Sequence, residues 1–213
     1  MKETSALRQS AAAGRQSGAA GRETLLLAIA FAAAYLPVDW LTFIHERPSL
    51  NITPWNPPAG LYMAFLLWTG ARGLPWVFLT LIAADVVVRG HPASPASLLL
   101  SNLVIVAGYG GAAHFLRHRA AIDLALPRVR DAAWLTGVAF LVAAAVAPAF
   151  IGVFVLDGAL PAADWPILAF QYWLGDAIGV AVVTPFLLLL RPPSTEPGAA
   201  PAWRTPALPS PAQ

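Results

Sequence analysis

The chain has 213 residues, of which 58% are hydrophobic and only 11% are charged, with a formal net charge of +2. Soluble domains carry about a quarter charged residues, so this composition excludes an ordinary water-soluble domain and indicates a polytopic membrane protein. The absence of cysteine also excludes a disulfide framework, a thiolate metal site and a thiol nucleophile.

The chain opens with 22 small and polar residues, which we expect to form a disordered cytosolic leader. The apolar sequence LLLAIAFAAAY follows, and with the small residues at 32–34 it also permits a cleaved signal peptide. Because apolar character resumes after Asp39 in WLTFI, we favour an uncleaved first helix.

Six apolar segments of roughly membrane-spanning length follow one another, at 24–44, 57–70, 74–89, 96–116, 132–156 and 167–190. They predict an all-α fold in which residues 23–190 form a six-helix membrane module. The second and third segments are short for a core of about 30 Å, so GARGLP between them also fits the tip of a re-entrant hairpin. Burying Arg72 at such a tip is costly, which favours a cytosolic turn.

Proline and glycine mark the ends of these segments. In WNPPAG, Asn56 is a good residue to precede a helix, and Pro57 suits the first helical position because its missing N–H is harmless there. Pro148 and Pro185 lie within predicted spans and should kink them. Small residues at helical spacing favour close helix packing; they are Gly108, Gly111, Ala112, Gly175 and Gly179.

The positive-inside rule predicts the orientation. With a cytosolic N-terminus, only Arg47 and Arg89 of the 13 lysines and arginines fall outside. The others fall on the cytosolic side: Lys2, Arg8, Arg15, Arg22, Arg72, Arg117, Arg119, Arg128, Arg130, Arg191 and Arg204. We therefore expect both termini to be cytosolic, with the four arginines between the fourth and fifth spans near anionic headgroups.

Catalytic and metal-binding motifs are weak throughout the sequence. His114 and His118 have a spacing that can chelate a metal, but the neighbouring Arg117 and Arg119 favour headgroup contacts. We expect no enzymatic activity, no metal and no cofactor. Residues 191–213 hold seven prolines, so we expect a flexible cytosolic tail, with a polyproline ligand as the alternative.

Costly polar side chains gather in the outer half of the predicted spans. Asp176 is the deepest, and a carboxylate near the bilayer centre costs roughly 2.5–3.5 kcal/mol. It should therefore face the bundle interior, a partner or water. We predict an outward-facing pocket that binds a small ligand and is lined by Trp55, Asn56, Asp85, Asn102, Tyr172, Trp173 and Asp176.

Several of the polar and aromatic residues in the outer half of the predicted spans also have a structural interpretation. Trp55 fits an interfacial aromatic belt, and Asn102 fits a hydrogen bond between helices. Asp39 and Asp85 lie near helix ends, where solvation would explain them. Asp176 has a structural partner or a neutral carboxyl group as its alternative.

Several motifs resemble one family. WNPPAGLYMAFLLWTGARGLPWVFL resembles the W-x-P-P-A-G segment, and YWLGDAIGVAVVTPFLLLL the closing W-L-G-D helix, of the bacterial membrane-associated sensor domain family, first class of the MASE group. LLLSNLVIVAGYGGAAHFLRHR and PRVRDAAWLTGVAFLVAAAVAPAFIGV are similar to its other spans, so the resemblance covers about 24–190. It marks Trp55, Pro57, Pro58, Gly60, Asn102, Trp173, Gly175, Asp176, Gly179 and Pro185.

The resemblance implies a sensory module of the bacterial inner membrane that relays a periplasmic or intramembrane cue to a cytosolic output partner. That partner would be a histidine kinase, a diguanylate cyclase or a transporter-like protein, and a homodimer is compatible with such signalling. Gly175, Gly179 and Pro185 would let the last helix shift. Asp85 stands where an amide is expected, which leaves the ligand's charge open.

Three alternatives remain open at the level of sequence. No output domain follows Leu190, which fits either a stand-alone sensor or a fragment that lost its effector. A small-solute binding subunit of a membrane transporter would also use an outward pocket. A scaffold whose polar residues only join helices is the third interpretation.

Overall fold

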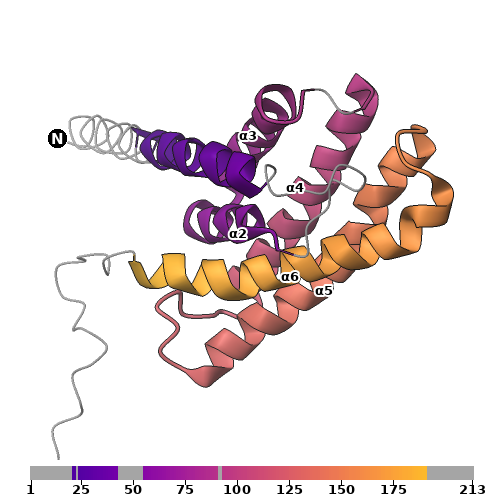
Figure 1. Ribbon diagram of the computed structural model, residues 1–213. Helices are drawn as coiled ribbons and strands as arrows, with labels where there is room; N and C mark the ends of the chain where they lie inside the picture. Colours follow the sequence, from indigo (N-terminus) through magenta and orange to yellow (C-terminus); the bar gives the residue numbers. More distant parts are fainter. Residues whose placement is uncertain (1–20, 23, 43–54, 91–92, 191–213) are drawn as a thin grey trace, which may run out of the picture.

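The computed structural model describes residues 21–22, 24–42, 55–90 and 93–190, and its regular structure is helical (Figure 1). The elements are a first helix (Thr24–Thr42), α2 (Pro57–Thr69), η1 (Gly70–Gly73), α3 (Leu74–Val87), α4 (Pro95–His118), α5 (Val129–Leu156), η2 (Ala162–Asp164) and α6 (Trp165–Leu190). The all-α prediction is confirmed. The predicted tail, and the leader apart from the helical Gly21 and Arg22, lie outside the described residues.

Five helical segments of the described residues are long and apolar enough to cross a membrane: Thr24–Thr42, Pro57–Val87, Pro95–His118, Val129–Leu156 and Ala162–Leu190. The second of these is α2 and α3 joined by the short turn η1. α2 has 13 residues and α3 has 14, so each is only about 20 Å long. Neither alone matches a hydrocarbon core of about 30 Å.

The chain reverses its direction at η1. Along α2, Tyr62 lies beside Tyr109 of α4, and the Arg117 guanidinium in the last turn of α4 donates to the Leu67 carbonyl. α2 and α4 therefore run in the same direction. α3 returns along α4, since Asp85 near its end contacts Asn102.

α5 and α6 are the longest helices and form an antiparallel hairpin (Figure 1). The indole of Trp165 at the start of α6 donates to the carbonyl of Pro148 in α5 over 3.1 Å, and Trp173 donates to that of Phe140 over 3.0 Å. Pro148 and Pro185 lie inside α5 and α6, which continue past them.

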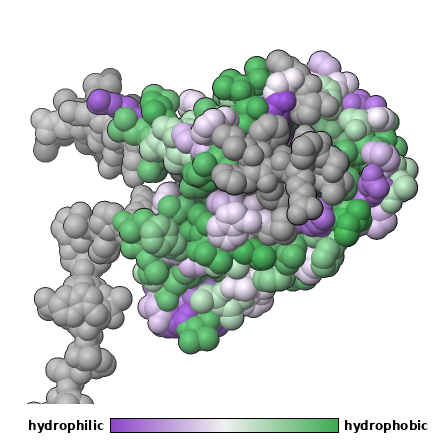
Figure 2. Space-filling model, viewed as in Figure 1, coloured by the Kyte–Doolittle hydropathy of each residue, from purple (hydrophilic) through white to green (hydrophobic). Residues whose placement is uncertain are grey.

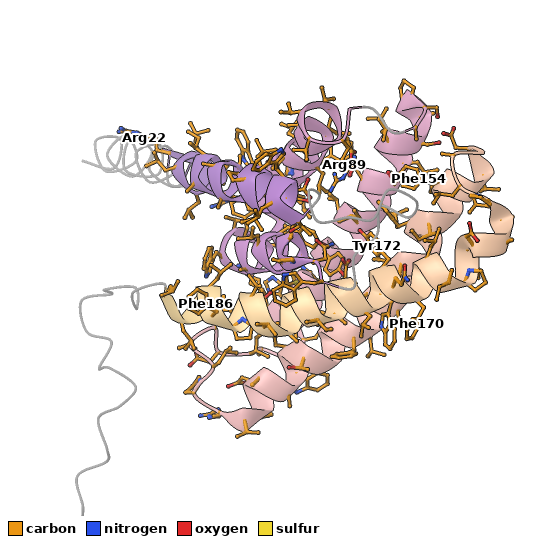
Figure 3. All side chains as sticks on the ribbon, viewed as in Figure 1. Arg22, Arg89, Phe154, Phe170, Tyr172 and Phe186 are labelled. Atoms are coloured by element: carbon orange, nitrogen blue, oxygen red, sulfur yellow. The ribbon has the colours of Figure 1, made fainter. Side chains whose placement is uncertain are left out.

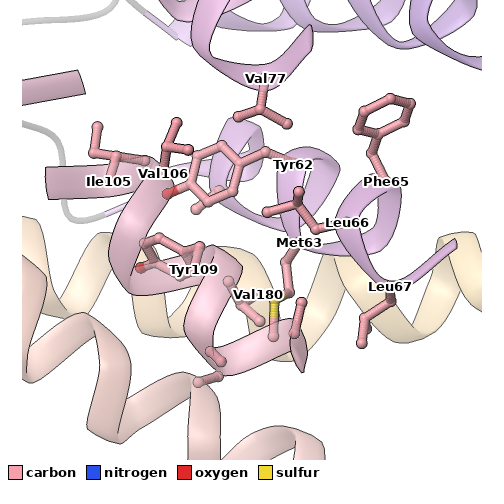
Figure 4. Close-up of a cluster of buried hydrophobic side chains, with 14 of the residues drawn as sticks. Tyr62, Met63, Phe65, Leu66, Leu67, Val77, Ile105, Val106, Tyr109 and Val180 are labelled. Carbon is pink, nitrogen blue, oxygen red and sulfur yellow. The ribbon is translucent and has the colours of Figure 1, made fainter. Parts of the chain in front are cut away.

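The core of the bundle surrounds α2. Its residues Tyr62, Met63, Phe65, Leu66 and Leu67 are all fully buried (Figure 4). α4 and α6 contact it from two sides, and Phe31 of the first helix stacks on Phe65 with ring centroids 4.6 Å apart. A helix that is apolar all round is expected to lie inside such a bundle.

Candidate functional site

The start of α2 lies directly against the middle of α6. A Cβ atom on Gly179 would lie 1.9 Å from the carbonyl oxygen of Asn56, and one on Gly60 would lie 2.5 Å from the carbonyl oxygen of Gly179. Glycine is therefore required at both positions, because any side chain would push the two helices apart. The Thr184 hydroxyl donates to the Gly60 carbonyl over 3.1 Å and adds a polar contact to the same interface.

The double proline lets α2 begin inside the bundle. The first four N–H groups of a helix have no partner within it, and each unsatisfied group costs several kcal/mol in a membrane. Pro57 and Pro58 have no N–H group at all. Of the neighbouring donors, the Asn56 N–H bonds the Gly175 carbonyl over 3.2 Å and the Ala59 N–H bonds the Asn56 carbonyl over 3.1 Å.

The carboxylate of Asp176 lies at this junction and accepts three hydrogen bonds. Its Oδ1 accepts from the amide of Asn56 over 2.6 Å. Its Oδ2 accepts from the hydroxyl of Tyr109 over 2.6 Å and from that of Tyr62 over 3.2 Å. These contacts join α6 to α2 and to α4. We name Asn56, Tyr62, Tyr109 and Asp176 the carboxylate cluster.

The carboxylate cluster is closed to solvent. Asp176 has no exposed surface, and Tyr62 and Tyr109 are also buried. The two phenol oxygens point to the same side, as Figure 4 shows. All three donors are neutral, and the N-terminal end of α2 beside them carries a partial positive charge. Hydrogen bonds to a charged group contribute roughly 1.5–3 kcal/mol each, which offsets the cost of burying the carboxylate.

A second polar cluster joins the first helix, α3 and α4. The guanidinium of Arg89 lies 2.6 Å from a carboxylate oxygen of Asp39 and 2.9 Å from one of Asp85. The amide of Asn102 donates to the other oxygen of Asp85 over 2.6 Å. Figure 3 shows Arg89 between the first helix and α4. We name Asp39, Asp85, Arg89 and Asn102 the ionic cluster.

The ionic cluster corrects one interpretation of the sequence. Asp39 and Asp85 are 4% and 7% exposed, so their interpretation as solvated helix-end residues is wrong. An arginine guanidinium does not lose its proton in a protein. Arg89 therefore stays charged and holds the two carboxylates together.

Four of the seven predicted pocket residues belong to these two clusters. Asn56 meets Asp176, whereas Asn102 meets Asp85. The remaining three are aromatic, and one of them, Tyr172, lies close enough to both clusters to interact with the charges of Asp176 and Arg89. Tyr172 stacks on Phe150 of α5 with centroids 4.5 Å apart.

The two tryptophans lie toward the outside. Trp173 packs against Phe140 and Phe170, and its indole bonds the Phe140 carbonyl. Trp55 is 44% exposed. Their spacing in the sequence placed Trp173 and Asp176 on one helix face. In the structure, however, the two side chains contact different residues.

Four members of the clusters were not among the predicted site residues, and one of them, Asp39, was interpreted only as a solvated helix-end residue. Tyr62 and Tyr109 lie in apolar helices, where a tyrosine is usually read as core. Arg89 was counted only as a charge in the orientation argument. One signal was available for the tyrosines, because a buried phenol usually finds a hydrogen-bond partner and Asp176 is an acceptor at a comparable depth.

Two further predictions concern glycines of α4 that would serve helix packing and a histidine pair that could chelate a metal. A Cβ atom on Gly108 would lie 2.3 Å from Val146, so this glycine serves close packing, whereas one on Gly111 would meet nothing within 4 Å. The rings of His114 and His118 lie 4.5 Å apart. Among the residues the structure describes, no three or more His, Cys, Asp or Glu side chains are arranged to hold a metal ion.

A family model, MASE1, matches residues 24–212 of the chain, and it describes a family of membrane-associated sensor domains. The match includes every described helix that contributes to the two clusters. The resemblance carried by WNPPAG and WLGDAIG is thereby confirmed. Among curated proteins and solved structures, none matches this chain.

Proposed function

Because the chain belongs to the MASE1 family of membrane-associated sensor domains, we propose that it signals by changing how α6 is held in the bundle. The family makes it a membrane sensory module. In this mechanism a cue reaches the C-terminal end of α6, and one observation supports it. Asp176 of α6 is fully buried and gathers donors from both α2 and α4.

The carboxylate cluster supports a two-state mechanism. Its three hydrogen bonds fix α6 at a point well before the helix ends at Leu190. If a cue weakens or replaces one of them, α6 takes a second position, and its C-terminal end carries the change to the segment that follows. A ligand shifts such an equilibrium only by binding one position more tightly than the other.

α4 provides a connection between the two clusters. Asn102 of the ionic cluster and Tyr109 of the carboxylate cluster are both buried on this helix, two turns apart. A displacement of α4 at Asn102 therefore changes the distance from Tyr109 to Asp176. We propose that the predicted small ligand acts on this outer half of the bundle, and that the signal then passes inward through α4 and α6.

The proposed topology has six helical segments in the bacterial inner membrane, with α2 and α3 as short segments of about 20 Å each, and both termini in the cytosol. The arginine distribution supports it, since Arg47 and Arg89 are the exceptions among the 13 basic residues. The α2–α3 hairpin also supports it. Because η1 lies beside Arg117 in the last turn of α4, the hairpin extends to the cytosolic end of the bundle.

The proposed partner is a cytosolic output protein, a histidine kinase or diguanylate cyclase, or a transporter-like membrane protein. The module itself would perform no chemistry. A reporter of output activity in cells, compared with uptake of radiolabelled solutes, distinguishes this role from that of a transporter subunit. Output that changes without uptake supports sensing, and uptake that depends on this chain favours the transporter.

Asp176→Asn tests the proposal directly. The substitution keeps the shape of the side chain but replaces an acceptor-only group with an amide, which disturbs all three donors. We expect the output response to disappear while the amount and the helical content of the protein stay near normal. Asp164→Asn in the outer loop is the matched control. A response of wild-type sensitivity in Asp176→Asn would refute the mechanism.

A further inference from the structure

An open groove runs along the outer face of α5, on the half of the helix that begins at Val129. It has a volume of about 310 Å³ and is lined by Arg130, Ala133, Trp134, Gly137, Val138 and Leu141. These positions share one face of a single helix. A Cβ atom on Gly137 would meet nothing within 4 Å, so no described part of the protein fills the groove.

The groove has the length of one leaflet of the membrane. From Arg130 to Leu141 the helix rises about 16 Å, and half of a hydrocarbon core is about 15 Å. Its inner part is apolar, and the indole of Trp134 forms one wall, beside Phe115 of α4 at a centroid distance of 5.8 Å. This shape suits an extended acyl chain.

The end of the groove carries a positive charge. The side chain of Arg130 is 59% exposed and lies 3.5 Å from Asp131, which is longer than a good hydrogen bond. Asp131 is itself only 1% exposed, so it meets the guanidinium from the protein side, while most of the Arg130 side chain stays exposed. Arg128, which precedes α5, is exposed nearby. The donors of Arg130 are therefore available to a phosphate at the membrane surface.

We propose that this groove binds one anionic phospholipid of the cytosolic leaflet, with an acyl chain along Gly137 and the phosphate at Arg130. In Figure 2 apolar colour covers much of the bundle, and one of the hydrophilic areas lies at the lower left, where α5 begins in the view of Figure 1. A second copy of the chain fits this groove less well. A symmetric dimer through it would bring two Arg130 side chains together.

Native mass spectrometry of the purified full-length chain tests the proposal. The protein is released from a neutral detergent after equilibration with equal amounts of phosphatidylglycerol and phosphatidylcholine that carry the same acyl chains. We expect retained phosphatidylglycerol to exceed retained phosphatidylcholine. One arginine near a membrane surface contributes about 1 kcal/mol, so Arg130→Gln should weaken phosphatidylglycerol binding about fivefold and leave phosphatidylcholine unchanged.

Gly137→Leu is the second variant, because it places an apolar side chain in the groove and its Cβ atom would meet nothing within 4 Å. It should reduce the retention of both lipids. Arg22→Gln and Ala30→Leu are the matched controls, since both residues are exposed on or just before the first helix, away from α5. Both controls should retain phosphatidylglycerol like the unmodified chain.

Three results would overturn the proposal. The first is equal retention of the two lipids by the unmodified chain. The second is unchanged retention in Gly137→Leu. The third is a shift between monomer and dimer in Gly137→Leu with lipid retention unaffected, which would assign the groove to a second copy of the chain. Gly137→Leu keeps the test decisive even if Arg130→Gln is poorly produced.

Discussion

The amide of Asn56 donates to the carboxylate of Asp176 over 2.6 Å, although 120 residues separate the two. The contact joins the two most distinctive motifs of the sequence, WNPPAG and WLGDAIG, at the place where α2 begins against α6. In the same place the backbone N–H of Asn56 bonds the carbonyl of Gly175. One short segment thus uses both its main chain and its side chain to hold α6.

The two tyrosines of the carboxylate cluster should differ in their contribution to stability. The hydroxyl of Tyr109 is 2.6 Å from Asp176 and that of Tyr62 is 3.2 Å away. We expect Tyr109→Phe to lower the free energy of unfolding by roughly 1.5–3 kcal/mol and Tyr62→Phe by less, because the shorter bond to a charged acceptor is stronger. Unfolding in mixed detergent micelles measures both. Equal losses of unfolding free energy in the two variants would contradict the expectation that the shorter hydrogen bond contributes more.

The glycines offer a matched pair of substitutions. A Cβ atom on Gly179 would lie 1.9 Å from the Asn56 carbonyl oxygen, whereas one on Gly111 would meet nothing within 4 Å. Gly179→Ala should therefore destabilise the bundle by about 1–3 kcal/mol through overpacking. Gly111→Ala should be neutral or stabilise its helix by up to about 1 kcal/mol. Melting temperatures in detergent compare them, and a fall in both would show that the helix contact is not the cause.

The ionic cluster should depend on Arg89 more than on any single carboxylate. Arg89→Gln leaves Asp39 and Asp85 buried without their common cation, and breaking a buried pair in this way costs about 3–5 kcal/mol. Because the Arg89 side chain is 31% exposed, we expect the lower end of that range.

Adding Asp39→Asn to Arg89→Gln should restore part of the loss, since one unpaired charge is removed. The double-mutant cycle is measured by unfolding, with Arg72→Gln, an exposed arginine in the turn η1, as the control. A double variant as unstable as the sum of the single ones would show that Asp39 and Arg89 act independently.

The topology can be tested by labelling, because the natural chain has no cysteine. A single cysteine at Ala163, in the loop before α6, should react with a membrane-impermeant maleimide in intact cells. One at Ala125, in the loop before α5, should react only after the cells are opened. Both residues are exposed, so access to the reagent depends on the side of the membrane. The opposite pattern would reverse the orientation.

The sequence by itself determined the class of fold and the approximate helix positions. A long apolar segment crosses a bilayer as a helix, because a helix satisfies its own backbone hydrogen bonds locally. Pro57 and Gly70 marked the ends of the short second helix, because the effect of proline or glycine on the backbone depends only on its neighbours in the chain. The position of Asp176 within the last helix also followed from the chain alone, because that helix coincides with one long apolar segment.

Only the tertiary structure decided which polar side chains meet. Helical spacing placed Trp173 on the face of Asp176, yet the partners of Asp176 come from α2 and α4, and Trp173 contacts α5. Asp39 likewise found Arg89, 50 residues away, in place of water. A contact between helices depends on their relative rotation and on how closely they approach, here set by Gly60 and Gly179. A periodic pattern within one helix contains no information about the rotation of its neighbour.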